Sequence, residues 1–283
     1  MTVSFLMNGN TMTTNHNLFN TTAAALLAGA ACSTPALAQD SSADLAKKLS
    51  NPVAALISVP LQLNHDRDIG PVDGGKRWGL NVQPVVPIEI NKDWNLISRT
   101  IIPLVVQDDI APGAGRQSGL GDIVQSVFFS PKATTSGGWI WGAGPVLLLP
   151  TGSSDLLSGR KWGAGPTAVV LKQDSGWTYG ALANHLWSFA GDSNRKDISA
   201  TFLQPFVSYT TPSALTFGFN TESTYDWKAK QWTLPLNISV SKVTKLGNQL
   251  ISVGGGLRYW ADGPDNGPQG VGVRLVVTFL FPK

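Results

Sequence analysis

The sequence is short of charge: Asp, Glu, Lys and Arg together make up only 14% of its 283 residues. Soluble domains average about 25% charged residues, so this composition argues against an ordinary cytosolic enzyme. Mean hydropathy is nevertheless only +0.03, and no apolar run approaches the ~18 residues that a membrane-spanning helix needs. The low charge therefore does not come from transmembrane helices, and a helical membrane protein is excluded.

Cysteine, histidine and clustered basic residues are equally scarce. The sequence has one Cys and three His. Because only His65 and His185 follow the leader described below, a His-based zinc site would lack ligands, and no metal, cofactor or catalytic site is predicted. The formal net charge is +3, and no Lys/Arg-rich run exists, which excludes a nucleic-acid-binding surface. Disorder is excluded by the aromatic content of 10 Trp, 11 Phe and 4 Tyr.

The N-terminus predicts export. Residues Ala23–Ala31 form a short apolar segment, and Ala36-Leu37-Ala38 provides a small-residue cleavage site. We therefore expect residues 1–38 to be a signal peptide that carries away Cys32, leaving a mature chain without thiols. A lipoprotein anchored through Cys32 is the alternative, but the position three before it is not Leu. Residues 39–52 predict a periplasmic helix and linker, with the helix over Ser42–Ser50.

From residue 53 to residue 283 the dominant pattern has period two. In Leu215–Asp226, Trp232–Lys242 and Val271–Phe281, apolar residues alternate with polar or small ones, which is typical of strands with two unlike faces. The same pattern predicts twelve strands: 54–64, 77–90, 94–107, 119–130, 139–150, 162–172, 177–190, 198–210, 214–226, 231–242, 250–260 and 270–281. Several prolines fall inside these strands and predict either bulges or a lateral gap in the wall.

The connectors alternate in length. Those after odd-numbered strands are mostly long and polar, whereas Asn91–Asp93, Gln173–Gly176 and Thr211–Ser213 are tight. An even strand number with long loops on one side and short turns on the other is typical of outer-membrane barrels. We therefore predict an all-β fold, a transmembrane antiparallel β-barrel of about 12 strands with a short N-terminal helix, located in the cell outer membrane. A soluble β-sandwich is the alternative.

Tryptophans mark the ends of the predicted strands. Amphipathic indoles at both edges of a lipid-facing band form girdles in outer-membrane barrels. The residues predicted to form the girdles are Trp78, Trp94, Trp139, Trp162, Trp177, Trp187, Trp232 and Trp260.

Charged side chains lie on the opposite, polar face of several strands. An Arg at the lipid midplane costs about 2–4 kcal/mol, so these residues are predicted to line the lumen. They could pair with one another and close a narrow interior, or they could form a charged constriction that selects permeants. The predicted lumen-lining residues are Glu89, Arg99, Asp122, Glu222, Arg258 and Arg274.

An outer-membrane enzyme with Ser, His and Asn is the obvious catalytic alternative. His185 follows Asn184, and Ser188 lies three positions later. Residues three apart on a strand point to opposite faces, so His185 and Ser188 cannot pair. No enzyme activity is predicted.

Several motifs resemble the meta-pathway phenol-degradation family of outer-membrane proteins, whose members carry the labels transporter or "neuromedin U". The resemblance covers about residues 44–283. The motifs that carry it are Asp44–Pro60, Gly119-Leu-Gly-Asp122, Gly142-Ala-Gly-Pro145, Tyr225-Asp-Trp227, Arg258-Tyr-Trp260 and Thr278–Lys283. This resemblance implies a β-barrel and passage of aromatic or other hydrophobic small molecules.

The function predicted from these observations is a passive channel or transporter for small hydrophobic or aromatic molecules. The alternative is a non-transporting structural or adhesion barrel. The expected partners are membrane lipid and lipopolysaccharide, a small-molecule permeant and the barrel-assembly machinery, with no nucleic acid.

Overall fold

The computed structural model describes residues 41–282. The predicted signal peptide, its cleavage site and Cys32 lie outside the described residues. Helix α1 (Ser42–Leu49) begins at the N-cap Ser41, whose side chain accepts from the Asp44 backbone N–H while the Asp44 carboxylate accepts from the Ser41 backbone N–H. No helix among the described residues is long and apolar enough to cross a lipid bilayer.

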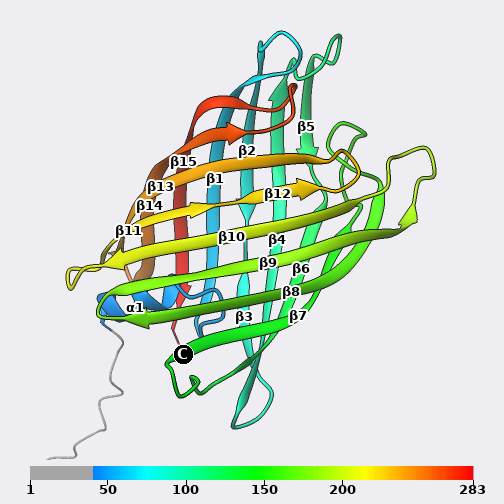
Figure 1. The fold of residues 1–283 in the computed structure, drawn as a ribbon. Coiled ribbons are helices and arrows are strands. Elements are labelled where there is room, and N and C mark those ends of the chain that lie inside the picture. Colours follow the sequence, from blue (N-terminus) through cyan, green and yellow to red (C-terminus); the bar gives the residue numbers. More distant parts are fainter. Residues whose placement is uncertain (1–40, 283) are drawn as a thin grey trace, which may run out of the picture. The chain divides into compact units, whose positions relative to one another are not determined.

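The rest of the described chain forms a closed antiparallel barrel of twelve strands, which confirms the predicted fold class (Figure 1). Strands β9 and β10 pair to close the sheet, and β1 pairs with the last strand, β15. The strand bounds are β1 (Ile57–Ile69), β2 (Gly75–Val82), β3 (Val85–Glu89), β4 (Trp94–Asp108), β5 (Arg116–Leu120), β6 (Ile123–Pro131), β7 (Trp139–Leu149), β8 (Lys161–Asp174), β9 (Trp177–Gly191), β10 (Ser199–Thr210), β11 (Leu215–Thr221), β12 (Ser223–Asp226), β13 (Gln231–Leu246), β14 (Gln249–Asp262) and β15 (Gln269–Phe281).

Three of the twelve wall strands are interrupted, which is why the sheet has fifteen segments. The interruptions separate β2 from β3, β5 from β6, and β11 from β12. Each contains one polar side chain that accepts hydrogen bonds: Gln83 and Glu222 accept from arginines inside the barrel, and Asp122 accepts from the loop of residues 150–160. The breaks in the wall therefore coincide with hydrogen-bond acceptors.

The two barrel ends have different connectors, as the sequence predicts. At the short-turn end the strands are joined by residues 90–93, 132–138, 175–176, 211–214 and 247–248. At the long-loop end they are joined by residues 70–74, 109–115, 150–160, 192–198, 227–230 and 263–268. Helix α1 and the C-terminal end of β15 both lie at the short-turn end (Figure 1).

The wall prolines leave the barrel closed, with local irregularities. Pro145 on β7 pairs with Pro166 on β8, and both belong to the repeated sequence Trp-Gly-Ala-Gly-Pro. At this level the described pairing of β6 with β7 stops between Ser126 and Phe129. Prolines lack the backbone donor, so the ladder loses hydrogen bonds here without losing strand order.

The glycine before Pro166 is required by a close approach of two strands. A Cβ placed on Gly165 would overlap the backbone oxygen of His185 on β9. We predict that Gly165→Ala lowers the free energy of unfolding by about 1–3 kcal/mol, the usual cost of overpacking. Urea unfolding in detergent micelles would measure it. Gly79→Ala is the control because no atom lies within 4 Å of its Cβ, and equal losses in both variants would contradict the prediction.

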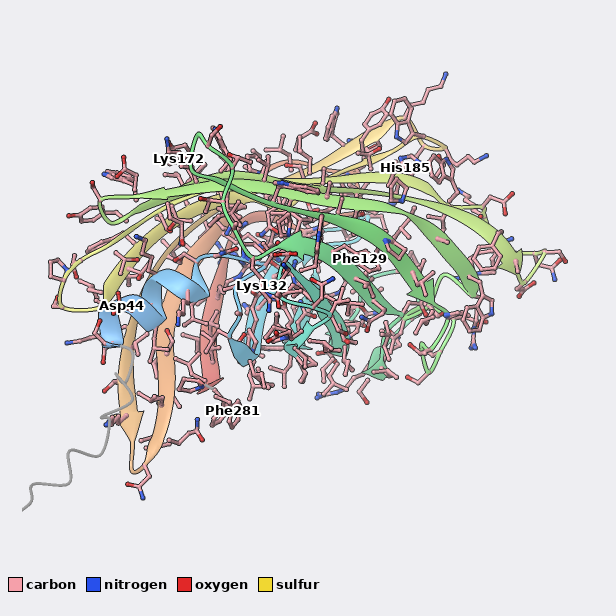
Figure 2. All side chains as sticks on the ribbon, turned by 90° about the horizontal axis from the view of Figure 1, so that it is seen from below. Asp44, Phe129, Lys132, Lys172, His185 and Phe281 are labelled. Atoms are coloured by element: carbon pink, nitrogen blue, oxygen red, sulfur yellow. The ribbon has the colours of Figure 1, made fainter. Side chains whose placement is uncertain are left out.

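The outer surface of the barrel is apolar, and the inner surface is mainly polar. Consecutive side chains on β15 show the division: Val273 and Leu275 are about half exposed, at 48% and 54%, whereas Arg274 between them is 6% exposed. Side chains project from both faces of the wall throughout (Figure 2). An apolar exterior is stable only against lipid, because exposed apolar surface is costly in water.

Two apolar clusters fill the interior at the short-turn end. One packs Leu45 and Ala46 of α1 against Leu56, Val243 and Leu280. The other packs Val53, in the segment after the helix, against five wall residues, which are Ile97, Phe128, Val169, Leu171 and Leu182. The helix and its following segment are thereby held inside this end of the barrel.

Candidate permeation lumen

A network of two arginines and one glutamate lies inside the barrel. Glu222 receives hydrogen bonds from Arg274 Nη1 and Nη2 at 2.9 and 2.8 Å, and from Arg258 Nη2 at 2.7 Å. Antiparallel pairing of β14 with β15 places Arg258 opposite Gly272 and so brings it diagonally close to Arg274. Glu222 lies at the interruption between β11 and β12 and contacts both arginines.

Neutral side chains on neighbouring strands complete the network. Arg274 Nε donates to Asn64 Oδ1 at 2.8 Å, and Arg258 Nε donates to Asn237 Oδ1 at 3.1 Å. Asp66 lies 3.5 Å from Arg258 Nη1 and accepts from Trp260 Nε1 at 3.0 Å. Because these strands are β1, β13, β14 and β15, the network spans the junction between the first and last strands.

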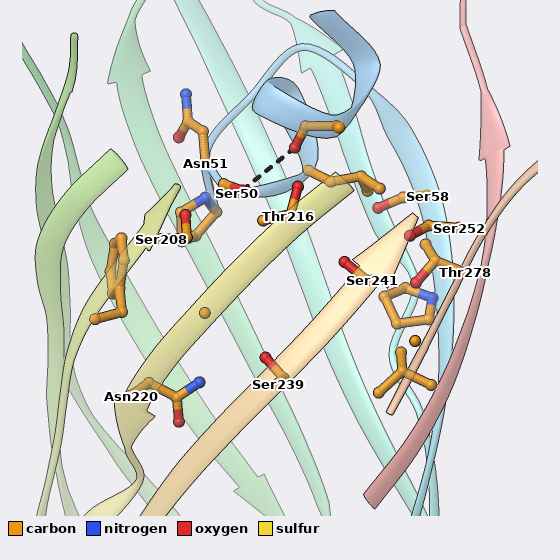
Figure 3. Close-up of a pocket in the computed structure, with 18 of the residues that line it drawn as sticks. Ser50, Asn51, Ser58, Ser208, Thr216, Asn220, Ser239, Ser241, Ser252 and Thr278 are labelled. Carbon is orange, nitrogen blue, oxygen red and sulfur yellow. Dashed lines mark hydrogen bonds between the residues drawn. The ribbon is translucent and has the colours of Figure 1, made fainter. Parts of the chain in front are cut away.

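Between this network and α1 lies a cavity of about 340 Å³. Figure 3 shows the helix beside it, with hydroxyl-bearing side chains directed toward it from the surrounding strands. Its apolar lining includes Leu49, Leu56, Val85, Phe206 and Val276. Its hydroxyl-bearing lining residues are Ser50, Ser58, Ser208, Thr216, Ser239, Ser241, Ser252 and Thr278.

The charges around this cavity have one sign. Its charged lining residues are Lys48, Arg99 and Arg274, and among the described residues that line it there is no carboxylate. Arg99 Nη2 donates to Gln83 Oε1 at 3.3 Å. Among residues 41–282, no carboxylate lies within ion-pair distance of Arg99, although Glu222 attracts it from farther away.

The segment after α1 separates this cavity from a second one. Asn51 and Ala54 border both cavities, and the second, of about 410 Å³, is also lined by Glu89, Lys132 and Ile140. Glu89 pairs with Lys132 at 2.7 Å. The predicted lumen residue Glu89 therefore lies at the short-turn end, away from the Arg258–Glu222–Arg274 network.

Asp122 has a different environment from the one predicted. Its carboxylate accepts from Ser158 Oγ at 2.6 Å and from the backbone N–H groups of Gly152 and Gly159 at 3.0 and 2.7 Å. It therefore fixes the loop of residues 150–160 at the long-loop end. The Leu156 carbonyl of that loop accepts from Gln107 Nε2, and Gln107 is 1% exposed. Asp122 anchors a loop and makes none of the network's described contacts.

Asp122→Ala should release this loop. The substitution removes three charge-assisted hydrogen bonds, each worth about 1.5–3 kcal/mol, so we expect cleavage at residues 150–160 by an added protease to be at least about tenfold faster. Limited proteolysis of detergent-solubilised protein would measure the rate. Asp155→Ala is the control, since its exposed carboxylate bonds only Arg160 in the described contacts, and equal acceleration would refute the anchoring role.

The aromatic residues form two bands on the outer surface. At the short-turn end, Trp94 contacts Trp141 edge to face, Trp139 contacts Tyr179, and Trp177 contacts Tyr209. At the long-loop end the exposed tryptophans are Trp78, Trp162, Trp187, Trp227 and Trp232. Trp260 departs from the prediction because it points inward, bonds Asp66, and lies 5.1 Å from the Arg258 guanidinium carbon.

His185 lies on the outer face of β9 (Figure 2). Its ring centroid is 4.0 Å from that of Trp187, with the two planes tilted by 46°. Its Nδ1 is 2.7 Å from Thr201 Oγ1, and its Nε2 is 3.4 Å from Ser199 Oγ, both on β10. Along a single strand the sequence offers only Ser188 as a hydroxyl near His185, whereas its partners in the structure lie on the neighbouring strand. These two hydroxyls provide hydrogen-bond partners for both ring nitrogens of the imidazole, which lies beside the aromatic band at the long-loop end. No cluster of three or more His, Cys, Asp or Glu that could hold a metal occurs in the described part of the chain.

Four of the six predicted lumen residues lie around one interior region: Glu222, Arg258 and Arg274 in direct contact, and Arg99 across the cavity. Asn64, Asp66 and Asn237 also belong to this region and were not among the residues predicted from the sequence. Asp66 was missed because the first strand was predicted to end at residue 64, whereas β1 continues to Ile69. Alternation continued through Asn64 and Asp66 would have placed both on the inner face.

No protein-family model and no curated protein sequence matches the chain. Among solved structures, the chain is similar to the COG4313 outer membrane channel from Pseudomonas putida F1, with a TM-score of 0.63 and 14% identity over 80% of this chain and 96% of that one. A weaker likeness is to the NanC porin (TM-score 0.47, 13% identity, 79% and 98% covered). Another is to outer membrane phospholipase A from Escherichia coli (TM-score 0.48, 8% identity, 80% and 90% covered).

At these identities the comparisons show the fold alone, and the phenol-degradation family stays a resemblance of sequence motifs. The fold, the apolar exterior and the two aromatic bands nevertheless agree on the kind of molecule. The chain is a twelve-stranded antiparallel β-barrel of the outer-membrane type.

Proposed function

We propose that the protein is a passive channel of the outer membrane for small hydrophobic or aromatic molecules. The observation that carries the proposal is the cavity of about 340 Å³ inside the barrel, which lies within the size range of small-molecule sites. Phe206, Val85 and Val276 offer apolar contacts there, and the surrounding hydroxyls offer hydrogen bonds. A barrel serving only as a structural element would need no such space.

The asymmetry of the connectors supports an orientation. Outer-membrane barrels have short periplasmic turns and longer extracellular loops, so the short-turn end with α1 faces the periplasm in this proposal. Lipid and lipopolysaccharide would then contact the outer surface, and the barrel-assembly machinery would insert the chain. Recovery in outer-membrane fractions, together with a heat-dependent shift in detergent gels, would test this location.

Solute entry into proteoliposomes tests the channel itself. Liposomes containing the full mature chain should admit a small neutral aromatic solute such as benzamide faster than protein-free liposomes do. Swelling or solute uptake would report the rate. A correctly folded barrel with neither solute entry nor conductance would refute the channel and favour the alternative, a non-transporting structural or adhesion barrel.

A further inference from the structure

Among the described residues around the middle of the barrel, the positive charges outnumber the negative ones. The central cations are Arg77, Arg99, Arg258 and Arg274, and the carboxylates facing them are Asp66 and Glu222. Four positive charges against two negative ones leave two positive charges. Glu222 is fully engaged by Arg258 and Arg274, and Asp66 bonds Trp260 and faces Arg258. Arg258 and Arg274 are balanced by Glu222 and Asp66, so the two surplus charges are Arg77 on β2, which donates to Gln107 at 2.9 Å, and Arg99, which lines the cavity.

Arg99 has donors to spare. A guanidinium has five N–H donors, and the described hydrogen bond uses one of them on the neutral Gln83 amide at 3.3 Å. Arg99 and Arg274 both line the cavity, and Lys48 of α1 lines it as well. A guanidinium in a partly desolvated space attracts a carboxylate strongly and can bind it through two parallel hydrogen bonds.

We propose that this cavity binds small organic anions, in particular aromatic or similarly compact carboxylates, with the carboxylate at Arg99. The apolar body would lie against Phe206, Val85 and Val276, and the serine and threonine hydroxyls would provide further donors. This inference rests on the proposed channel function and narrows it, because it assigns the permeant a negative charge. The described lining of the cavity contains no carboxylate, which fits such a ligand because an acidic lining residue would repel it.

Matched solutes separate the charge from the aromatic body. Benzoate and benzamide have nearly the same size and shape, and only benzoate is charged. We expect benzoate to enter proteoliposomes about fivefold faster than benzamide, the ratio that a modest attraction in a partly screened lumen would give. Millimolar benzoate should also block part of the chloride conductance in planar bilayers, and benzamide should not.

Variants of Arg99 test whether this residue causes the preference for benzoate over benzamide. Arg99→Gln should bring the benzoate-to-benzamide ratio toward one, and Arg99→Lys should retain most of it because the charge is kept. Arg116→Gln is the control: it removes the same charge from an exposed side chain on β5 that lies 3.9 Å from Asp108, and it should leave the ratio unchanged. If Arg99→Gln does not fold, the block of wild-type conductance and the Arg99→Lys ratio decide.

Equal entry of both solutes through the wild-type barrel would overturn the anion site and leave the channel standing. Entry of neither solute would overturn the channel, and the anion site with it. A benzoate preference that survives Arg99→Gln unchanged would show that Arg99 does not bind the carboxylate, which also overturns the proposal.

Discussion

Replacing Glu222 with glutamine should destabilise the folded barrel by about 3–5 kcal/mol, the usual result of removing one partner from a buried ion pair. The glutamine has nearly the same volume, so packing is kept while Arg258 and Arg274 lose their shared carboxylate. Their two positive charges then repel each other in a site where each is at most 10% exposed. Urea unfolding in detergent micelles would measure the change.

The same variant should alter ion selectivity. With one negative charge removed, the surplus among Arg77, Arg99, Arg258, Arg274, Asp66 and Glu222 rises from two positive charges to three, so the preference for chloride over potassium should increase. Reversal potentials under a salt gradient would show it. Glu89→Gln is the control, because Glu89 is 67% exposed beside Lys132 at the short-turn end and an exposed pair contributes about 0–1 kcal/mol. Equal losses of stability in the two variants would contradict the buried role of Glu222.

Leu45→Asp should open the short-turn end. Leu45 is 1% exposed and packs in the apolar cluster with Leu56, Val243 and Leu280. An unpaired carboxylate buried there would cost several kcal/mol. A helix of eight residues is only marginally stable on its own. We therefore expect the packing of α1 against the barrel to be too weak to offset this cost. The helix should therefore leave its place while the hydrogen-bonded wall remains. We expect single-channel conductance to rise several-fold.

The control for this variant keeps the charge and changes the face of the helix. Ser42→Asp adds the same negative charge at an exposed position of the first helical turn, where the helix dipole favours it. Its conductance should match the wild type. Unchanged conductance in a Leu45→Asp barrel that still shows its heat-dependent gel shift would mean that α1 and the segment after it do not limit the passage.

The fold was predictable because period two is visible in single strands. Twelve predicted strands correspond to the twelve strands of the wall, and the predicted helix over Ser42–Ser50 differs from α1 by one residue. The interruptions were not predictable from alternation, because inward polar residues such as Gln83, Asp122 and Glu222 fit a continuous strand as well as a broken one. The extension of β1 to Ile69 was missed for a related reason: its charged residues look like a loop.

The interior was predictable only in part. Alternation identified Arg258 and Arg274 as polar-face residues, and the intervening loop suggested that they lie diagonally close. It could not show that Glu222, from a strand not adjacent to theirs, reaches both. Trp260 was assigned by its place near a strand end, although Leu257 and Tyr259 on the outer face put it on the inner one. Facing, rather than position along the strand, decides the role of an aromatic residue.

The interior network also has a consequence for the order in which the barrel assembles. Asn64 and Arg274 are separated by 210 residues along the chain, and Asp66 and Trp260 by 194. These contacts cannot exist until β1 meets β15, so we expect them to be absent from the transition state for folding. Interactions that form late slow unfolding and leave the folding rate unchanged. The contacts of Arg258 and Arg274 therefore stabilise the pairing of β1 with β15 once the barrel has closed. Removing these contacts should shorten the lifetime of the closed barrel without slowing its formation.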